Sequence, residues 1–91
     1  MGLLNIFKKD ADTLYISLDE QPQPRNAAMF SIVHGSRVMA TSQIQMDATG
    51  LDTACRVIDF HRAALQACGY KAVMFRNLND FAQERIRAAL K

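Results

Sequence analysis

Two apolar segments separated by Gly35-Ser36 constrain the fold of this chain more than any other feature of its sequence. Residues 27–34 and 37–46 are both rich in large apolar and β-branched side chains. A glycine followed by a small polar residue suits a two-residue type II′ turn, because glycine adopts the positive φ of the first position without a Cβ clash. The pattern therefore predicts an antiparallel hairpin.

The two-residue loop also predicts the register of this hairpin, because pairing runs outward from the turn. The expected pairs are His34 with Arg37, Val33 with Val38, Ile32 with Met39, Ser31 with Ala40 and Phe30 with Thr41. One face of the hairpin then carries Met29, Val33, Val38, Ala40, Ile44 and Met46, and the other carries Phe30, Ile32 and Met39. Since both faces are partly apolar, we expect the second face to need a cover.

A strand is expected before the hairpin, and a long helix after it. Apolar side chains alternate at Leu14, Ile16 and Leu18, as in a strand with one buried face. Residues 21–26, with prolines at 22 and 24, form a connector. The helix is predicted to begin at Thr49, whose hydroxyl caps it with Asp52 as the acidic partner, and to end at Gly69. Its inner stripe is Leu51, Ala54, Cys55, Ile58, Leu65 and Cys68, widened by Val57 and Phe60.

A short strand and a last helix complete the chain. The near-continuous apolar run at residues 71–75 is typical of a strand buried on both faces. Asn77 is expected to cap the last helix. The inner stripe of that helix is predicted to contain Leu78, Phe81, Ala82, Ile86 and Ala89. Its acids lie early and its basic residues late, which matches the helix macrodipole.

Length and composition indicate one ordinary globular domain over residues 1–91. Of the 91 residues, 49% are hydrophobic and 22% charged, and eleven basic residues against nine acidic ones leave a formal charge of only +2. Without a dense basic block, the sequence predicts no strong polyanion-binding surface. Cys55 and Cys68 are expected about 20 Å apart on one helix, too far to form a disulfide within the chain. Reduced thiols and no apparent signal peptide favour a cytoplasmic protein.

Residues 1–10 form an amphipathic N-terminal segment. Its apolar side chains are Leu3, Leu4, Ile6 and Phe7, and Lys8 and Lys9 follow them. Peripheral membrane contact is one use of such a segment. We favour a short helix that covers the open face of the sheet, because that face is expected to carry apolar side chains. No apolar run approaches the length of about 20 residues that a transmembrane helix needs.

The segment order predicts an α+β domain: a short N-terminal helix followed by β-β-β-α-β-α, with helices packed on a mixed four-stranded sheet. From Leu14 to Leu90 this order resembles the opening half of the ribonuclease H-like fold. It is also similar to a double-stranded-RNA-binding domain extended by one strand. Each resemblance implies a function that the residues can be tested against.

The ribonuclease H resemblance implies carboxylates on the first strand, early in the first helix and at the end of the fourth strand. Asp19 or Glu20 and Asp52 are candidates for the first two places, but Arg76-Asn77 occupies the third. Two-metal cleavage needs several converging carboxylates. We therefore expect no catalytic residues and no enzyme activity.

The RNA-binding resemblance implies a lysine cluster at the start of the helix that follows the three strands. This chain has an acid, Asp52, in that turn and no lysine. Arg25 on the connector and Arg37 at the hairpin tip are still able to contact a phosphate backbone. RNA or DNA binding is therefore kept as the alternative function.

No other pattern predicts a cofactor or a metal. His34 and His61 have no ligand spacing around them, and the four glycines are isolated, so no phosphate-binding loop is expected. Cys55 and Cys68 are expected to be buried apolar residues.

The sequence thus favours a small non-catalytic protein-interaction module, either self-associating, as in a homodimer, or binding and modulating a larger complex. The predicted partner-binding residues are Phe30, Ile32, Met39, Arg37 and Arg25. Compact domains of this size and segment order occur among phage-encoded inhibitors, including anti-CRISPR proteins, and the layout is similar to some of them. That resemblance implies an inhibitor that acts through a protein partner.

Overall fold

A four-stranded mixed sheet with the strand order β3-β2-β1-β4 is the framework of the computed structural model, which describes residues 12–22 and 25–91. The elements are β1 (Thr13–Glu20), β2 (Ala27–His34), β3 (Arg37–Gln45), α2 (Ala48–Phe60), α3 (Arg62–Ala67), β4 (Ala72–Arg76) and α4 (Asp80–Leu90). The first three strands are antiparallel neighbours, and β4 lies parallel to β1. This order agrees with the predicted one. The expected helix over residues 1–10 lies outside the described residues.

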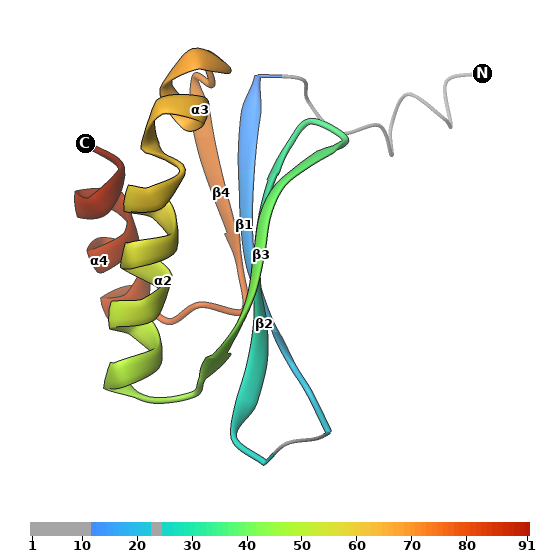
Figure 1. The fold of residues 1–91 in the computed structure, drawn as a ribbon, viewed down its shortest axis with the longest axis vertical. Helices are drawn as coiled ribbons and strands as arrows, with labels where there is room; N and C mark the ends of the chain where they lie inside the picture. The colour runs from blue at the N-terminus through green and yellow to red at the C-terminus, as the bar shows by residue number, and fades with distance from the viewer. Residues whose placement is uncertain (1–11, 23–24) are drawn as a thin grey trace.

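The three described helices all lie on one face of the sheet (Figure 1). Alternating side chains of the strands point toward them, as the period of two in β1 predicts. The core between the sheet and the helices contains Leu14, Ile16, Phe30, Ile32, Ala40, Ile44, Ala54, Ile58, Leu65 and Ile86. Phe30 has the largest fully buried side chain, and Ile32 is also fully buried.

A β-bulge in β3 changes the predicted hairpin register. The pairs His34 with Arg37 and Val33 with Val38 are confirmed, but the next pair is Ile32 with Ala40, because Met39 is an extra residue on β3. The predicted pairs from Ile32 to Phe30 are therefore wrong by one residue. Such a bulge is common on an edge strand.

The bulge also corrects the assignment of faces, since a shift of one residue moves every later side chain to the other side of the strand. Ala40 and Ile44 point to the helices together with Phe30 and Ile32, while Val38 and Val33 lie on the opposite face. The prediction that Phe30 and Ile32 lie on a second, uncovered face is wrong. Both are core residues beneath the helices: Ile32 has no exposed surface, and Phe30 is 1% exposed and borders only the groove described below.

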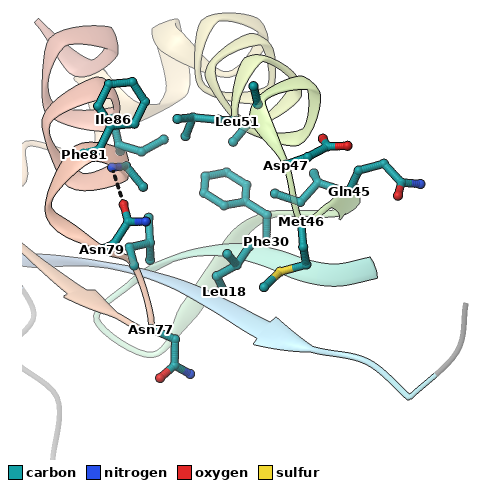
Figure 2. Close-up of a pocket in the computed structure, with 15 residues that line it drawn as sticks. Leu18, Phe30, Gln45, Met46, Asp47, Leu51, Asn77, Asn79, Phe81 and Ile86 are labelled. Carbon is teal, nitrogen blue, oxygen red and sulfur yellow. Dashed lines mark hydrogen bonds between the residues drawn. The ribbon is translucent and has the colours of Figure 1, made fainter. Parts of the chain in front are cut away.

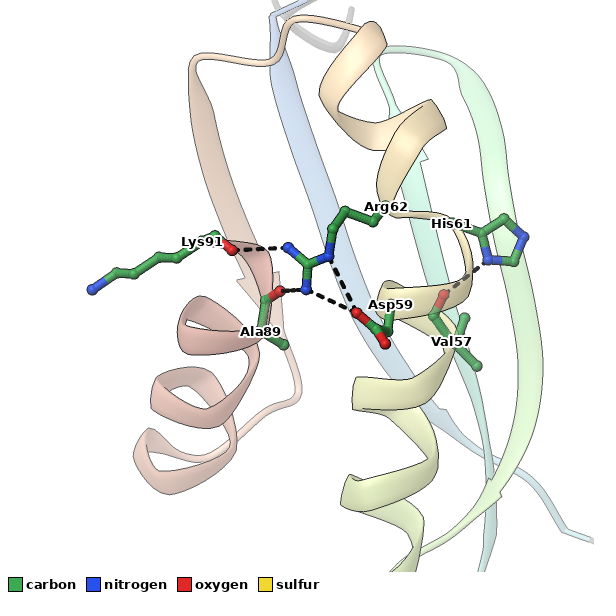
Figure 3. Close-up of polar contacts among 6 residues, drawn as sticks. All are labelled: Val57, Asp59, His61, Arg62, Ala89 and Lys91. Atoms are coloured by element: carbon green, nitrogen blue, oxygen red, sulfur yellow. Dashed lines mark hydrogen bonds and ion pairs between the residues drawn. The ribbon is translucent and has the colours of Figure 1, made fainter.

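The long helix begins earlier and is less continuous than predicted. Asp47, and not Thr49, is the N-cap of α2, because its Oδ1 accepts a hydrogen bond of 2.9 Å from the Gly50 backbone N–H. The helix is interrupted at His61, whose Nδ1 lies 2.9 Å from the Val57 carbonyl oxygen (Figure 3). The backbone N–H of His61 donates to the same carbonyl at 3.1 Å, and the chain restarts after His61 as α3.

Two further expectations are corrected near the C-terminus. β4 is an edge strand with one exposed face, on which Met74 is 57% exposed, and so it is not buried on both faces. The N-cap of α4 is Asn79, whose Oδ1 accepts from the Ala82 N–H at 2.8 Å. Asn77 instead has a φ of 66° in the preceding loop. Phe60 and Phe81, both predicted to face the core, are 85% and 66% exposed.

Arg62 joins the ends of the two long helices (Figure 3). Its guanidinium donates to the carbonyl oxygens of Lys91 at 2.8 Å and Ala89 at 2.6 Å, and it also forms an ion pair with Asp59 at 3.1 Å. A cation is favourable at the C-terminal end of a helix, where unpaired carbonyls carry partial negative charge. Arg62 therefore fixes the end of α4 to the chain just after α2.

Candidate apolar groove

An apolar groove of about 410 Å³ opens where the first turns of α2 and α4 face the ends of the strands (Figure 2). It is lined by Leu18, Phe30, Ile44, Gln45, Met46, Asp47, Ala48, Leu51, Ala54, Asn77, Leu78, Asn79, Phe81, Ala82 and Ile86. The Phe30 ring points from the sheet toward Leu51 and Ile86, so it forms the floor. Volumes of this order are typical of sites that bury one or a few side chains or a small ligand.

The groove lies beyond the polar contacts that join α2 and α4. Arg62 holds their C-terminal ends, and Arg85 in the middle of α4 donates to Asp52, just after the first turn of α2, at 2.9 Å. Beyond this pair, residues from the first turns of both helices flank the groove. Ala54 and Ala82 line the groove with single methyl groups. The core is thus left open at one end.

The lip of the groove is also apolar. Phe81 is 66% exposed and Met46 is 45% exposed, although each lines the groove with part of its surface. Exposed side chains of this size are individually ordinary, but here they continue the buried surface of the core to the outside. The result is a groove lined mainly by apolar side chains, with Phe30 at its floor and Phe81 at its lip.

The rim carries negative charge. Asp47 lines the groove, and the exposed Asp80 lies between the lining residues Asn79 and Phe81. Asp52 is paired with Arg85, and this hydrogen bond is the main cause that raises the pKa of the Arg85 guanidinium. Asp47 and Asn79 already satisfy one N–H of each helix. The helix ends are therefore capped by the chain itself. The rim carboxylates are Asp47, which lines the groove, and Asp80, next in sequence to two lining residues; neither has a basic ion-pair partner among the described residues.

The predicted partner-binding residues do not form one surface. Phe30 lies in the floor of the groove, Ile32 in the core and Met39 partly buried at the bulge. Arg25 and Arg37 are both exposed. They lie beyond opposite ends of the eight-residue strand β2, roughly 25 Å apart at the usual rise per residue. These two arginines cannot contact the same small site.

The carboxylates considered for catalysis are also separated. Asp19 lies on the sheet face opposite the helices, where Arg76 reaches its two oxygens at 2.8 Å and 2.9 Å. Asp52 lies on α2, on the other side of the sheet. Within residues 12–22 and 25–91 there is no group of three His, Cys, Asp or Glu side chains that could hold a metal ion.

The sheet face opposite the described helices is mixed in character. One row across all four strands is apolar or aromatic and consists of Met74, Tyr15, Val33 and Val38. The next row is Arg76, Ser17, Ser31 and Thr41. The face that residues 1–10 were expected to cover is the one with Phe30 and Ile32, which lies beneath the described helices instead. Residues 1–10 themselves lie outside the described residues.

Local sequence signals do not predict the groove. Helical spacing assigns Phe81 to the core but does not show where the core ends along α4. The signal that was missed is the pair Asn79-Asp80, a second capping site two residues after Asn77. Had that site been chosen, Phe81 would fall in the first helical turn, at the end of the core.

None of the helices that the structure describes is long and apolar enough to cross a membrane. No protein-family model, no curated protein and no solved structure matches the chain.

Proposed function

We propose that this chain is a non-catalytic protein-interaction module whose groove accepts a large apolar side chain from a basic segment of a partner protein. The observation that supports the proposal is a groove lined mainly by apolar side chains, with the buried Phe30 at its floor and the exposed Phe81 at its lip. A preformed apolar cleft with a few polar groups at its rim is the usual form of a binding site. The interaction surface predicted from Phe30, Ile32 and Met39 is replaced by this groove.

The size of the groove sets the expected occupant. Burying one Leu, Met or Phe side chain contributes about 1.5 to 3 kcal/mol, so a single anchor supports weak binding and tight binding needs contacts outside the groove. Asp47 and Asp80 favour an anchor that is flanked by Lys or Arg. Their effect should be strongest on the association rate and should weaken in high salt.

The same carboxylates disfavour a nucleic acid at this site, because they repel phosphate. Elsewhere, Arg76 and Arg85 are engaged with acids of the chain, and Arg25 and Arg37 are far apart. Nucleic-acid binding, the alternative drawn from the sequence, has no support from a specific contact in the fold. The segment order shared with the ribonuclease H-like fold does not contribute to the proposal, because segment order alone does not determine function.

The absence of catalysis is part of the proposal and can be tested directly. RNA–DNA hybrid, duplex and single-stranded substrates should stay intact with the protein in the presence of magnesium or manganese. Cleavage that disappears in Asp19→Asn would contradict the non-catalytic proposal, because contamination by another nuclease would not respond to that substitution.

Selection from a displayed library of random peptides tests the binding site. We expect the enriched peptides to carry a large apolar anchor next to Lys or Arg, and to bind Ala82→Phe at least tenfold more weakly, because the added ring fills the groove. Ala88→Phe is the matched control, since it places the same ring on an exposed position of the same helix. Peptides that bind Ala82→Phe and wild type equally well, with both variants folded, would refute the groove as the binding site.

A further inference from the structure

The outer face of α2 carries the most exposed large apolar side chain among the described residues. Phe60 is 85% exposed, and the exposed Arg56 lies one helical turn before it on the same face. The neighbouring acid, Asp59, is already paired with Arg62. The surface therefore presents an aromatic anchor beside an unengaged cation.

This anchor has the chemistry that the groove is proposed to accept. Phe60 supplies the apolar ring, and Arg56 supplies the positive charge that complements Asp47 and Asp80 at the rim. Phe60 cannot enter the groove of its own chain, because twelve helical residues place it about 18 Å along α2 from Ala48. Only another molecule can bring the two surfaces together.

We propose that the occupant of the groove is Phe60 of a second copy of this chain, with Arg56 of that copy beside the carboxylates of the rim. The inference rests on the proposed function of the groove. Because the two contacting surfaces differ, each copy keeps one free groove and one free anchor after the first contact. The association is therefore head-to-tail and continues into longer assemblies unless it closes into a ring.

A two-fold dimer through Phe81 is the competing arrangement, and charge disfavours it. Two grooves facing each other would bring Asp47 and Asp80 of both copies together, and like charges at close range repel. The head-to-tail contact instead places a cation against these acids. It should therefore weaken as the ionic strength rises.

Mixing two variants tests the proposal. Phe60→Ser keeps the groove and removes the anchor, while Ala82→Phe keeps the anchor and fills the groove. The samples are compared by sedimentation velocity at high protein concentration. We expect wild type and the control Ala88→Phe to form species larger than a monomer, and Phe60→Ser and Ala82→Phe each to stay monomeric alone. Their equimolar mixture should form a dimer that grows no further. A wild-type chain that stays monomeric at its highest soluble concentration would overturn the proposal.

Charge reversal provides a second test with exposed residues, so that folding is not at risk. Arg56→Glu should lower self-association at least tenfold. Mixing it with Asp80→Lys should restore association into alternating chains, because each variant then meets an opposite charge on the other. If Phe60→Ser associates as wild type does while Phe81→Ser is monomeric, the two-fold arrangement is correct and the head-to-tail one is wrong. If peptides bind the groove but the variant mixtures do not associate, this inference is wrong and the proposed function stands. If peptides do not bind the groove and the mixtures do not associate, both are wrong.

Discussion

Gly50→Ala should destabilise this protein, although the same change in most helices stabilises it. In an ordinary helical position, alanine is favoured over glycine by about 0.5 to 1 kcal/mol. Gly50 is different because a Cβ built on it would lie 1.6 Å from the Gln45 carbonyl oxygen and 2.6 Å from its carbonyl carbon. The first turn of α2 rests directly on the backbone at the end of β3.

The magnitude follows from what must move. Real Cβ atoms essentially never approach another atom closer than 3.0 Å, so α2 must retreat by roughly 1.4 Å. Gln45 cannot yield easily, because it pairs with Ala27 and the next residue, Met46, donates to the Asn26 carbonyl at 2.7 Å. Overpacking costs about 1 to 3 kcal/mol, and a displaced α2 also weakens the cap from Asp47, which is worth about 1 kcal/mol. After the gain in helix propensity, a net loss of about 1 to 3.5 kcal/mol is expected.

Urea denaturation followed by circular dichroism measures this loss, and thermal unfolding should show a midpoint lowered by roughly 4 to 8 °C per kcal/mol. Thr49→Ala is the control, since Thr49 is exposed in the same helical turn and this change should be neutral or stabilise by up to about 0.5 kcal/mol. If Gly50→Ala is as stable as wild type or more stable, α2 does not touch β3 here and the wall of the groove is placed wrongly.

Three other substitutions test the contacts that hold the helices. Asn79→Ala should lower the free energy of unfolding by about 1 kcal/mol because it removes the cap of α4, and Asn79→Asp should retain most of that stability. If wild type and these two variants are equally stable in urea, the cap is not formed. Arg62→Met should cost about 1 to 3 kcal/mol and speed amide exchange in the last turn of α4, and unchanged exchange there would argue against the observed hydrogen bonds. His34→Leu should stabilise by about 1 kcal/mol, because Nε2 of His34 is buried and has no hydrogen-bond partner among the described residues; a loss of stability would show that this nitrogen is paired.

Most of the element order could be predicted from the sequence, because it depends on local signals. The alternation in β1 and the turn at Gly35-Ser36 each act within a few residues, and both are confirmed as strand and turn. The capping sites were less certain, since Asp47 and Thr49, or Asn77 and Asn79, offer similar side chains two residues apart. Which of them caps depends on where the helix must lie against the sheet.

The groove could not be predicted, because it depends on the angle between elements that are distant in sequence. Helical spacing places Phe60 and Phe81 beside core residues, but it does not show how far the core extends along each helix. The bulge at Met39 was missed for a similar reason. Nothing in the local sequence distinguishes an extra residue in β3 from a regular one. The bulge is needed because it turns Ala40 and Ile44 toward the helices.

The bulge also bears on which changes of chain length the fold can absorb. Removing one residue from a regular strand turns every side chain on one side of the deletion to the opposite face of the sheet. At Met39 the opposite holds, because the residue is surplus to the pairing: its removal would join Val38 to Ala40 and leave their partners, Val33 and Ile32, unchanged. A chain lacking Met39 should therefore fold with the same core and lose only the partial burial of one methionine, whereas a chain lacking Thr41 should not.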